Sequence, residues 1–221
     1  MAPPKAVRIA VGSGQVSGLL LTPARPRAAY VFAHGAGAGM AHAFMEAVAQ
    51  ELSARAIATL RFQFPYMEQG GKRPDAPKVA HAAVRAAVAK AGDLIPDVPL
   101  FAGGKSFGGR MTSQAEALAS LGVEGLVFFG FPLHPAGAPS AERATHLADV
   151  KVPMLFLQGT RDALADIGLL KPVVKRLGKR ATLHLVADGD HSFHVPAKTG
   201  RKDAQVRAEI LDAFAAWVTS L

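Results

Sequence analysis

The chain of 221 residues contains no cysteine. Disulfide bonds, a thiolate nucleophile and cysteine-ligated metal sites are therefore excluded. Long hydrophobic runs are also missing, because the longest one, residues 125–133, is far shorter than the roughly 20 residues of a membrane-spanning helix. The start of the chain, Met-Ala-Pro-Pro-Lys-Ala-Val-Arg, lacks the apolar core of a signal peptide. We therefore expect a soluble, cytoplasmic protein with no membrane partner.

Acidic residues are the scarcer charged type: 17 of them accompany 25 lysines and arginines, for a formal net charge of +8. Basic residues are concentrated in 171–180 and again at Lys198, Arg201 and Lys202. A nucleic-acid-binding protein usually adds interleaved aromatic residues or a known binding module. Neither is present, so we expect no nucleic-acid partner. The charge fits either a solvated basic surface or an anionic substrate, and both interpretations stay open.

Hydrophobic residues make up 50% of the sequence and charged residues 19%. This composition is typical of a folded protein with a sizeable core and not of a disordered chain. The length suits one α/β domain, and no linker, internal repeat or low-complexity tract divides it. We expect residues 1–221 to form a single domain.

The most informative motif is Gly-Lys-Ser-Phe-Gly at residues 104–108, which fits the pattern G-x-S-x-G. In this nucleophile elbow a serine lies on a sharp turn between a strand and a helix, with its hydroxyl exposed above a sheet. Residues 98–102 predict the strand, with Pro99 tolerated at its start. Apolar residues follow at helical spacing: Met111, Ala115, Leu118 and Ala119. The two glycines would let strand and helix approach closely around Ser106.

Two other interpretations of this motif exist. Gly-Lys-Ser is also the end of a phosphate-binding Walker A loop, G-x-x-x-x-G-K-[ST], but the first glycine of that pattern is replaced here by Pro99. The segment is also compatible with a glycine-rich turn that has no chemistry. The rest of the chain has to decide among the three.

Strand and helix patterns alternate along the chain. A hairpin of residues 7–11 and 16–21 comes first, with Gly-Ser-Gly between its strands. Further strand patterns lie at 28–33, 57–62, 98–102, 126–129, 154–157 and 183–186. Helical patterns lie around 44–52, 84–91, 111–119 and 206–218. Repeated strand–helix units after a hairpin predict an α/β fold with a mostly parallel central sheet, flanked by helices on both faces.

Polar segments follow three of the other predicted strands, at the edge of the sheet where chemistry collects in such folds. They are His-Gly-Ala-Gly-Ala-Gly at 34–39, Gln-Gly-Thr-Arg-Asp at 158–162 and Asp-Gly-Asp-His-Ser-Phe-His at 188–194. Ser106, Asp162 and His191 thus come in the chain order of the α/β-hydrolase triad: serine, acid, histidine.

The sequence resembles the α/β-hydrolase fold family over nearly its whole length. The similarity lies in 34–39, 61–62, 103–109, 131–134 and 190–193. It is most similar to small, lid-poor, dienelactone-hydrolase-like members. Among these it resembles uncharacterised hydrolases related to a testis-expressed human protein and to a non-catalytic subunit of a histone acetyltransferase complex. The resemblance implies a serine hydrolase fold but no particular substrate, and the non-catalytic relative shows that the fold can persist without the chemistry.

The predicted chemistry divides among three side chains. Ser106 would attack an acyl carbon once His191 takes the proton of its hydroxyl. Asp162 would hold the histidine tautomer and stabilise the imidazolium that forms. We favour Asp162 as the acid because it directly follows a strong buried strand. Asp166 lies where a carboxylate would stabilise a helix N-terminus, and Asp190 adjoins the histidine too closely in sequence to aim at it. Asp188 is the remaining alternative.

An oxyanion would be bound by the backbone N–H of Phe107 and by a second one from the loop after residues 28–33. Ala36 is the first candidate for that second donor and Gly37 is the next. Three further residues are expected to line or support the pocket: His34, Lys105 and His134. We expect His34 to orient the oxyanion loop by hydrogen bonding and not to act as a base.

No cofactor or metal is expected. Asp188, Asp190, His191 and His194 lie close together in sequence, but their spacing matches no known ligand set. Only about twenty residues separate the strand pattern that ends near 129 from the one that starts near 152, too few for a large lid. We therefore expect an open site with a minimal lid.

The expected function is hydrolysis of small carboxylic esters, or thioesters, through an acyl-enzyme, with a small-molecule substrate as the partner. Acyl transfer and peptidase activity share the same constellation and stay open. The alternative is a catalytically idle α/β-hydrolase scaffold that binds a protein partner.

Overall fold

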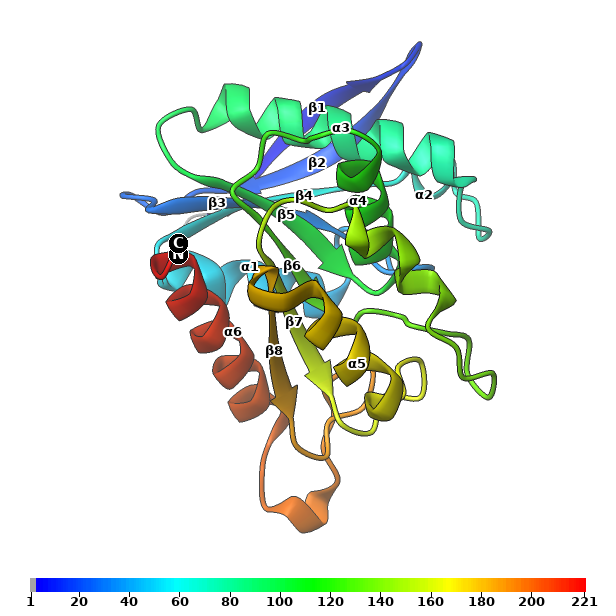
Figure 1. Ribbon diagram of the computed structural model, residues 1–221. Helices are drawn as coiled ribbons and strands as arrows, with labels where there is room; N and C mark the ends of the chain where they lie inside the picture. Colours follow the sequence, from blue (N-terminus) through cyan, green and yellow to red (C-terminus); the bar gives the residue numbers. More distant parts are fainter. Residues whose placement is uncertain (1–2) are drawn as a thin grey trace.

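The computed structural model describes residues 3–221; residues 1 and 2, which begin the segment examined for a signal peptide, lie outside the described residues. Within this range eight strands form one sheet in the order β1-β2-β4-β3-β5-β6-β7-β8 (Figure 1). The strands are β1 (Lys5–Val11), β2 (Gly14–Leu21), β3 (Ala28–Ala33), β4 (Ile57–Phe62), β5 (Leu100–Lys105), β6 (Gly125–Phe129), β7 (Met154–Gly159) and β8 (Ala181–Val186). The helices are α1 (Ala43–Ala54), α2 (Pro65–Glu68), α3 (Pro77–Leu94), α4 (Phe107–Leu118), α5 (Ile167–Leu177) and α6 (Asp203–Thr219). Short 3-10 helices are η1 (Glu142–Ala148), η2 (Gly178–Arg180) and η3 (Ala197–Thr199).

The sheet is antiparallel at one end and parallel over the rest. β1 and β2 form the predicted hairpin, and β2 pairs antiparallel with β4. All neighbouring strands from β4 to β8 are parallel. The prediction of a mostly parallel α/β sheet is therefore confirmed. Because these strands run in one direction, the segments that follow β3, β5, β6, β7 and β8 start at the same edge of the sheet.

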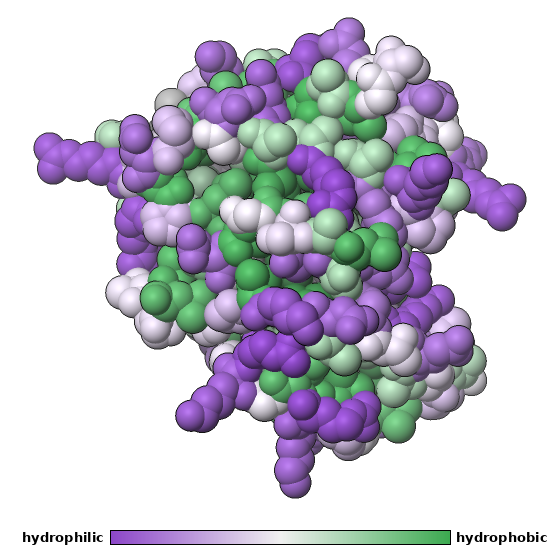
Figure 2. Space-filling view, turned by 45° about the horizontal axis from the view of Figure 1, so that its top comes forward, coloured by the Kyte–Doolittle hydropathy of each residue, from purple (hydrophilic) through white to green (hydrophobic). Residues whose placement is uncertain are grey.

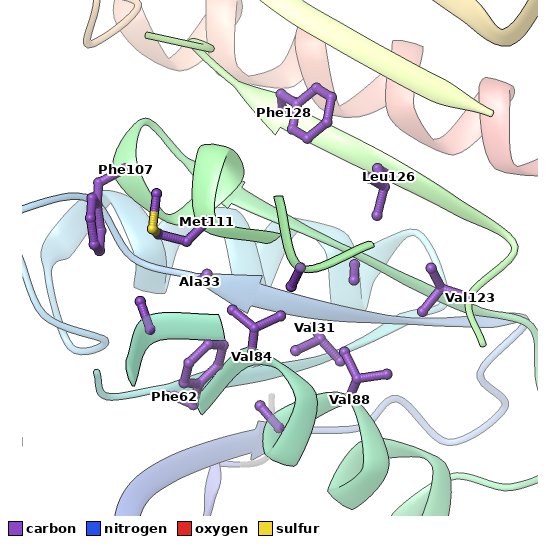
Figure 3. Close-up of a cluster of buried hydrophobic side chains, with 14 of the residues drawn as sticks. Val31, Ala33, Phe62, Val84, Val88, Phe107, Met111, Val123, Leu126 and Phe128 are labelled. Atoms are coloured by element: carbon purple, nitrogen blue, oxygen red, sulfur yellow. The ribbon is translucent and has the colours of Figure 1, made fainter. Parts of the chain in front are cut away.

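Two hydrophobic cores lie on the two faces of the sheet. All six residues of β3 are buried, because alternate side chains of a strand point to opposite faces and both faces are covered. Tyr30 and Phe32 pack in the core under α1 and α6. Val31 and Ala33 pack in the core under α3, α4 and α5. Figure 3 shows part of this second core, with Val84 of α3 directed toward the strands.

The strand that leads to Ser106 differs from its prediction. We expected it at residues 98–102, but β5 spans Leu100–Lys105, because the backbone of Gly103 and Gly104 still pairs with β3 and β6. The apolar helical positions expected after the motif are also wrong at the last two residues: Leu118 is 72% exposed, and Ala119 is exposed and lies beyond the end of α4. α4 buries Met111 and Ala115 but turns Leu118 to solvent.

The connection from β6 to β7 carries no helical lid. Residues 130–153, all of them described, contain η1 as their one helical element, and η1 packs against α4 and α5. The predicted minimal lid is confirmed. Access to the carboxyl edge of the sheet is therefore not restricted by this connection.

The basic segment 171–180 lies on the outer side of α5 and on η2. Leu170, Val173 and Leu177 of α5 are buried against the sheet, while Lys171 and Lys175 are exposed. Figure 2 shows hydrophilic residues spread over the face that it displays, with apolar areas between them. Within the part of the chain that the structure describes, no helix has both the length and the apolar character needed to cross a membrane.

Gly108 offers a test of how tightly α4 is packed on β3. A Cβ atom at Gly108 would lie 2.5 Å from Ala33 O, so we expect Gly108→Ala to lower the free energy of unfolding. The loss should be about 3 kcal/mol, the upper part of the range for overpacking a rigid contact. Gly92 of α3 is the matched control, since a Cβ atom there would meet nothing within 4 Å. Gly92→Ala should raise the free energy of unfolding by about 0.5 kcal/mol, because alanine is the better helix former. Urea titrations measure both, and a Gly108→Ala protein as stable as wild type would contradict this packing.

Candidate active site

Ser106 lies on the turn between β5 and α4, at the carboxyl end of a central strand. Its backbone has φ 50° and ψ −114°, in the positive-φ region that residues other than glycine rarely adopt. The turn requires glycine at position 104, because a Cβ atom there would lie 2.4 Å from Ala33 O. Its side chain does not cap the helix. The hydroxyl is therefore free of the helix end on which it is mounted.

A cavity of about 430 Å³ opens beside Ser106. Its walls come from the glycine-rich loop after β3, the start of α1, and the loops after β7 and β8. Phe44, Met45 and Leu164 form its apolar part, and Ser106 and His191 its polar part. The serine and the histidine thus share one cavity at the edge where α/β sheets bind ligands. A cavity of about 500 Å³ between η1 and α5 contains neither of them.

Asp162 is the acid that contacts His191. Its Oδ2 lies 2.7 Å from His191 Nδ1, and its Oδ1 accepts a hydrogen bond from Leu164 N–H at 2.8 Å. The Asp162 side chain is fully buried, whereas the His191 side chain is 24% exposed. A carboxylate in this position holds the proton on Nδ1 and leaves Nε2 able to accept one.

The His191 ring makes one side-chain hydrogen bond within residues 3–221, the one to Asp162, and none joins it to the Ser106 hydroxyl. Hydrogen bonds between a nucleophile and its base are often long or poorly aligned until substrate is present. The structure therefore brings Ser106 and His191 to the same cavity without a direct bond between them.

None of the three other acids near the site is hydrogen-bonded to His191 within residues 3–221. Asp166 caps the N-terminus of α5, as the sequence predicts. Asp190 Oδ1 accepts hydrogen bonds from the backbone N–H groups of Ser192 and His194 and so holds its own turn. Asp188 is exposed. Of the four acids, Asp162 is the one that hydrogen-bonds His191 within the described residues.

His194, the other histidine of this segment, is turned away from Asp162 and forms an exposed ion pair with Asp203 at 2.9 Å. The hydrogen bond and the charge of Asp203 raise the pKa of His194 above its ordinary value. Among residues 3–221, no group of three or more His, Cys, Asp or Glu side chains is placed to hold a metal ion.

Hydrogen bonds from the segment after β4 hold the glycine-rich loop after β3. His34 is fully buried, with Nε2 accepting from Phe64 N–H at 3.1 Å and Nδ1 donating to Gly35 O at 2.8 Å. Because a backbone N–H can only donate, Nε2 must be unprotonated and His34 neutral. Burial lowers the pKa of His34 to about 4, against a weaker opposite effect of its bond to Gly35. This geometry fits the loop-orienting role expected for His34.

The alternative oxyanion donor Gly37 does not fit. Its N–H donates to the Tyr66 hydroxyl at 3.0 Å and is thereby occupied. Ala36 lines the cavity, and its N–H has no hydrogen-bond acceptor among residues 3–221. Phe107 is the first residue of α4, where the N–H groups of the first turn have no acceptor within the helix. The N–H groups of Ala36 and Phe107 are therefore available to an oxyanion, whereas that of Gly37 already has an acceptor.

Lys105 reaches the loop that carries His191. Its Nζ donates to His191 O at 2.5 Å and lies 5.6 Å from the centroid of the Phe193 ring. Burial lowers the pKa of Lys105 to about 8, and the nearby carboxylates of Asp162 and Asp190 act in the opposite direction. Lys105 both lines the cavity and supports the histidine backbone.

His134 supports the site without lining it. It is buried, its Nε2 accepts from Asp166 N–H at 2.8 Å, and its Nδ1 donates to Pro135 O at 2.8 Å. It does not reach the cavity beside Ser106. Of the two roles expected for His134, pocket lining is therefore wrong. The residue joins the connection after β6 to the one after β7.

A second serine–histidine contact, between Ser113 and His146, is of another kind. Ser113 Oγ lies 2.8 Å from His146 Nε2. Ser113 is, however, fully buried within α4, and its hydroxyl donates to Arg110 O. No carboxylate hydrogen-bonds the His146 ring within residues 3–221, and neither residue lines the cavity beside Ser106. The contact packs η1 against α4.

The sheet order, the serine turn and the missing lid define an α/β-hydrolase architecture. Residues 26–219 match the family model described as an alpha/beta hydrolase domain. The chain therefore belongs to the alpha/beta hydrolase family, and the prediction of a hydrolase is confirmed at that level.

Solved structures share the fold over almost the whole chain. A lid-less α/β serine hydrolase from Xanthomonas campestris is 20% identical, with a TM-score of 0.77 and coverage of 98% of this chain and 96% of that one. A dienelactone hydrolase from Anabaena variabilis is also 20% identical, with a TM-score of 0.80 and 99% of each chain covered. Est1E from Butyrivibrio proteoclasticus, with ferulic acid bound, is 16% identical, with a TM-score of 0.71 and coverage of 95% and 100%. The resemblance to lid-poor, dienelactone-hydrolase-like members is therefore confirmed at the level of the fold.

Two residues that organise the site escape the sequence analysis. Gln158 hydrogen-bonds Asp162, and the available signal was a polar side chain within an otherwise apolar buried strand. Tyr66 accepts from the oxyanion loop, and nothing in its local sequence distinguishes it from a packed aromatic residue.

The buried His34 generates a prediction for acid pH. Its folded-state pKa of about 4 lies below the ordinary 6.5, so between these values the unfolded chain binds more protons. Stability should therefore fall as the pH drops from 6.5 to 4, with His34 contributing up to about 1.4 kcal/mol per pH unit. His34→Gln should flatten this slope, whatever its effect at pH 7. Urea unfolding at several pH values measures the slope.

Tyr66→Phe is the matched control, because it loosens the same loop without removing a group that titrates in this range. Its slope should equal that of wild type. A His34→Gln slope as steep as that of wild type would show that His34 is not buried in its neutral form.

Proposed function

We propose that this protein is a serine hydrolase that cleaves small carboxylic esters, or thioesters, with Ser106, His191 and Asp162 as its triad. One observation carries the proposal. A serine on a strained turn shares a cavity with a histidine whose Nδ1 is bonded to a buried carboxylate at 2.7 Å. This combination is the arrangement that activates a hydroxyl for attack on an acyl group.

In the proposed reaction His191 Nε2 takes the hydroxyl proton of Ser106 while Oγ attacks the carbonyl carbon. The N–H groups of Phe107 and Ala36 stabilise the oxyanion that forms. His191 then returns the proton to the departing alcohol or thiol, which leaves an acyl-enzyme. Water, deprotonated by His191, releases the acid and restores the serine, while Asp162 stabilises the imidazolium in both halves.

The cavity limits the size of the substrate. A volume of about 430 Å³ with an apolar wall of Phe44, Met45 and Leu164 suits a short acyl chain or a single aromatic ring. Residues 130–153 form no helical lid that could cover a longer acyl chain. Est1E, which shares the fold, has been solved with bound ferulic acid, a molecule with a single aromatic ring. Short acyl esters are therefore the proposed substrates.

The first test is labelling with a fluorophosphonate, which reacts with an activated serine. We expect wild type to be labelled at Ser106 and to hydrolyse a short acyl ester, and Ser106→Ala to lose both properties. Ser113→Ala is the control and should keep both, because Ser113 is buried away from the cavity. Labelling that survives in Ser106→Ala would refute the assignment, and a wild-type protein without label or activity would favour the idle scaffold.

The second test concerns the acid. Asp162→Asn should keep the fold but favour the wrong histidine tautomer, with a loss of kcat on the order of 10⁴ by analogy with other triads. Asp166→Asn, Asp188→Asn and Asp190→Asn are the controls, because those side chains do not contact His191. Steady-state kinetics on one ester compares the four variants. The assignment of Asp162 would be wrong if Asp162→Asn stayed within about tenfold of wild type in kcat while one of the other variants lost its activity.

A further inference from the structure

Gln158 is a fully buried amide in β7, a strand whose other residues are apolar or glycine. A buried amide destabilises the fold unless its polar atoms are hydrogen-bonded. Both ends of this one are bonded. Its Oε1 accepts from Phe131 N–H at 2.9 Å, and its Nε2 donates to Asp162 Oδ2 at 2.5 Å. The amide therefore connects the segment after β6 with the acid after β7.

The direction of this amide follows from its partners. A backbone N–H can only donate, so the oxygen of Gln158 must face Phe131 and its NH₂ group must face Asp162. An ionised carboxylate only accepts, which matches that NH₂ group. Neither end could be reversed without leaving two buried groups unpaired. The orientation of the Gln158 amide therefore matches an ionised carboxylate at Asp162.

The Asp162 carboxylate receives three donors. Its Oδ2 accepts from Gln158 and from His191 Nδ1, while its Oδ1 accepts from Leu164 N–H. Because Gln158 and the Leu164 N–H bind the two carboxylate oxygens independently of the imidazole, they fix the orientation of the carboxylate. Oδ2 is then held where the imidazole must meet it.

The backbone segment that Gln158 binds also packs against the histidine ring. Gly130 precedes Phe131 and has φ 68°; a Cβ atom on it would lie 3.3 Å from His191 Nδ1. Gln158 therefore links the acid partner of His191 with the backbone that lies beside the ring.

We infer that Gln158 is a positioning residue of the hydrolase reaction, which holds the Asp162 carboxylate and the Gly130–Phe131 backbone in the arrangement that orients His191. This inference rests on the proposed function. Gln158 does not line the cavity, so it acts through Asp162 and not on the substrate.

Two variants separate the hydrogen bonds of Gln158 from its volume. Gln158→Leu keeps a similar volume and removes both hydrogen bonds. Gln158→Glu keeps the oxygen that accepts from Phe131 N–H but replaces the NH₂ group that donates to Asp162 by a second oxygen. In both we expect kcat on a short acyl ester to fall about 10- to 100-fold, the loss expected from one hydrogen bond to a charged group. KM should stay unchanged, because the cavity wall is intact. The control is Gln114→Leu, which removes an amide of α4 that is hydrogen-bonded to His81 of α3 and should leave kcat unchanged.

A double variant distinguishes an effect of Gln158 that acts through Asp162 from general damage to the packing. If Gln158 acts through Asp162, adding Gln158→Leu to Asp162→Asn should lower kcat by less than about threefold further, because the two residues form one unit. Multiplication of the two losses would overturn the inference. So would single variants that both stay within about threefold of wild type in kcat. Gln158→Glu serves in the same cycle if Gln158→Leu does not fold, as judged by urea unfolding.

Fluorophosphonate labelling of wild type keeps the two proposals apart. A wild-type protein that is neither labelled nor active would refute the hydrolase function, and with it the role of Gln158. A labelled, active wild type whose Gln158 variants behave like wild type would refute the positioning role alone.

Discussion

The first turn of α4 packs on the backbone at the end of β3 with no side chain between them. Glycine at positions 104 and 108 makes this possible, since a Cβ atom at either would come within 2.5 Å of Ala33 O. Ser106 adopts its positive-φ conformation beside this contact, and the start of α4 lies against the loop that follows β3. The two proposed oxyanion donors, Phe107 and Ala36, belong to these two elements. Their separation therefore depends on this close backbone contact.

Three polar groups at the site are held by residues from neighbouring segments. His34 is bonded by the backbone after β4, Asp162 by Gln158 of β7, and the His191 carbonyl by Lys105 at the end of β5. The donors and acceptors are thus oriented by the folded framework before any ligand arrives. Preorganised dipoles of this kind stabilise developing charge without a cost of reorientation during the reaction.

The sequence predicts best what depends on local pattern. The strands β3 and β4 begin and end where the apolar runs 28–33 and 57–62 predict, and the order of serine, acid and histidine predicts which strand ends meet. β5 extends past its predicted end because pairing with two neighbours outweighs the low strand preference of glycine. α5 escapes prediction because Pro172 lies inside it, where a proline usually interrupts a helix. The bonds that join Gln158 to Phe131 and Tyr66 to Gly37 span 27 and 29 residues of sequence, and no local pattern encodes them.

The strand order has a consequence for how the chain folds. β3 lies between β4 and β5, and Ala29 pairs with Leu100 although a helix, a strand and two further helices separate them in sequence. Closing such a loop costs entropy before the contact is gained, so pairing of this kind makes folding slow. The serine turn needs β3 and α4 together, and its histidine follows β8, near the end of the described chain. During synthesis the central strands therefore keep open edges until their neighbours have formed, and Ser106 and His191 can share their cavity only after β8 has emerged.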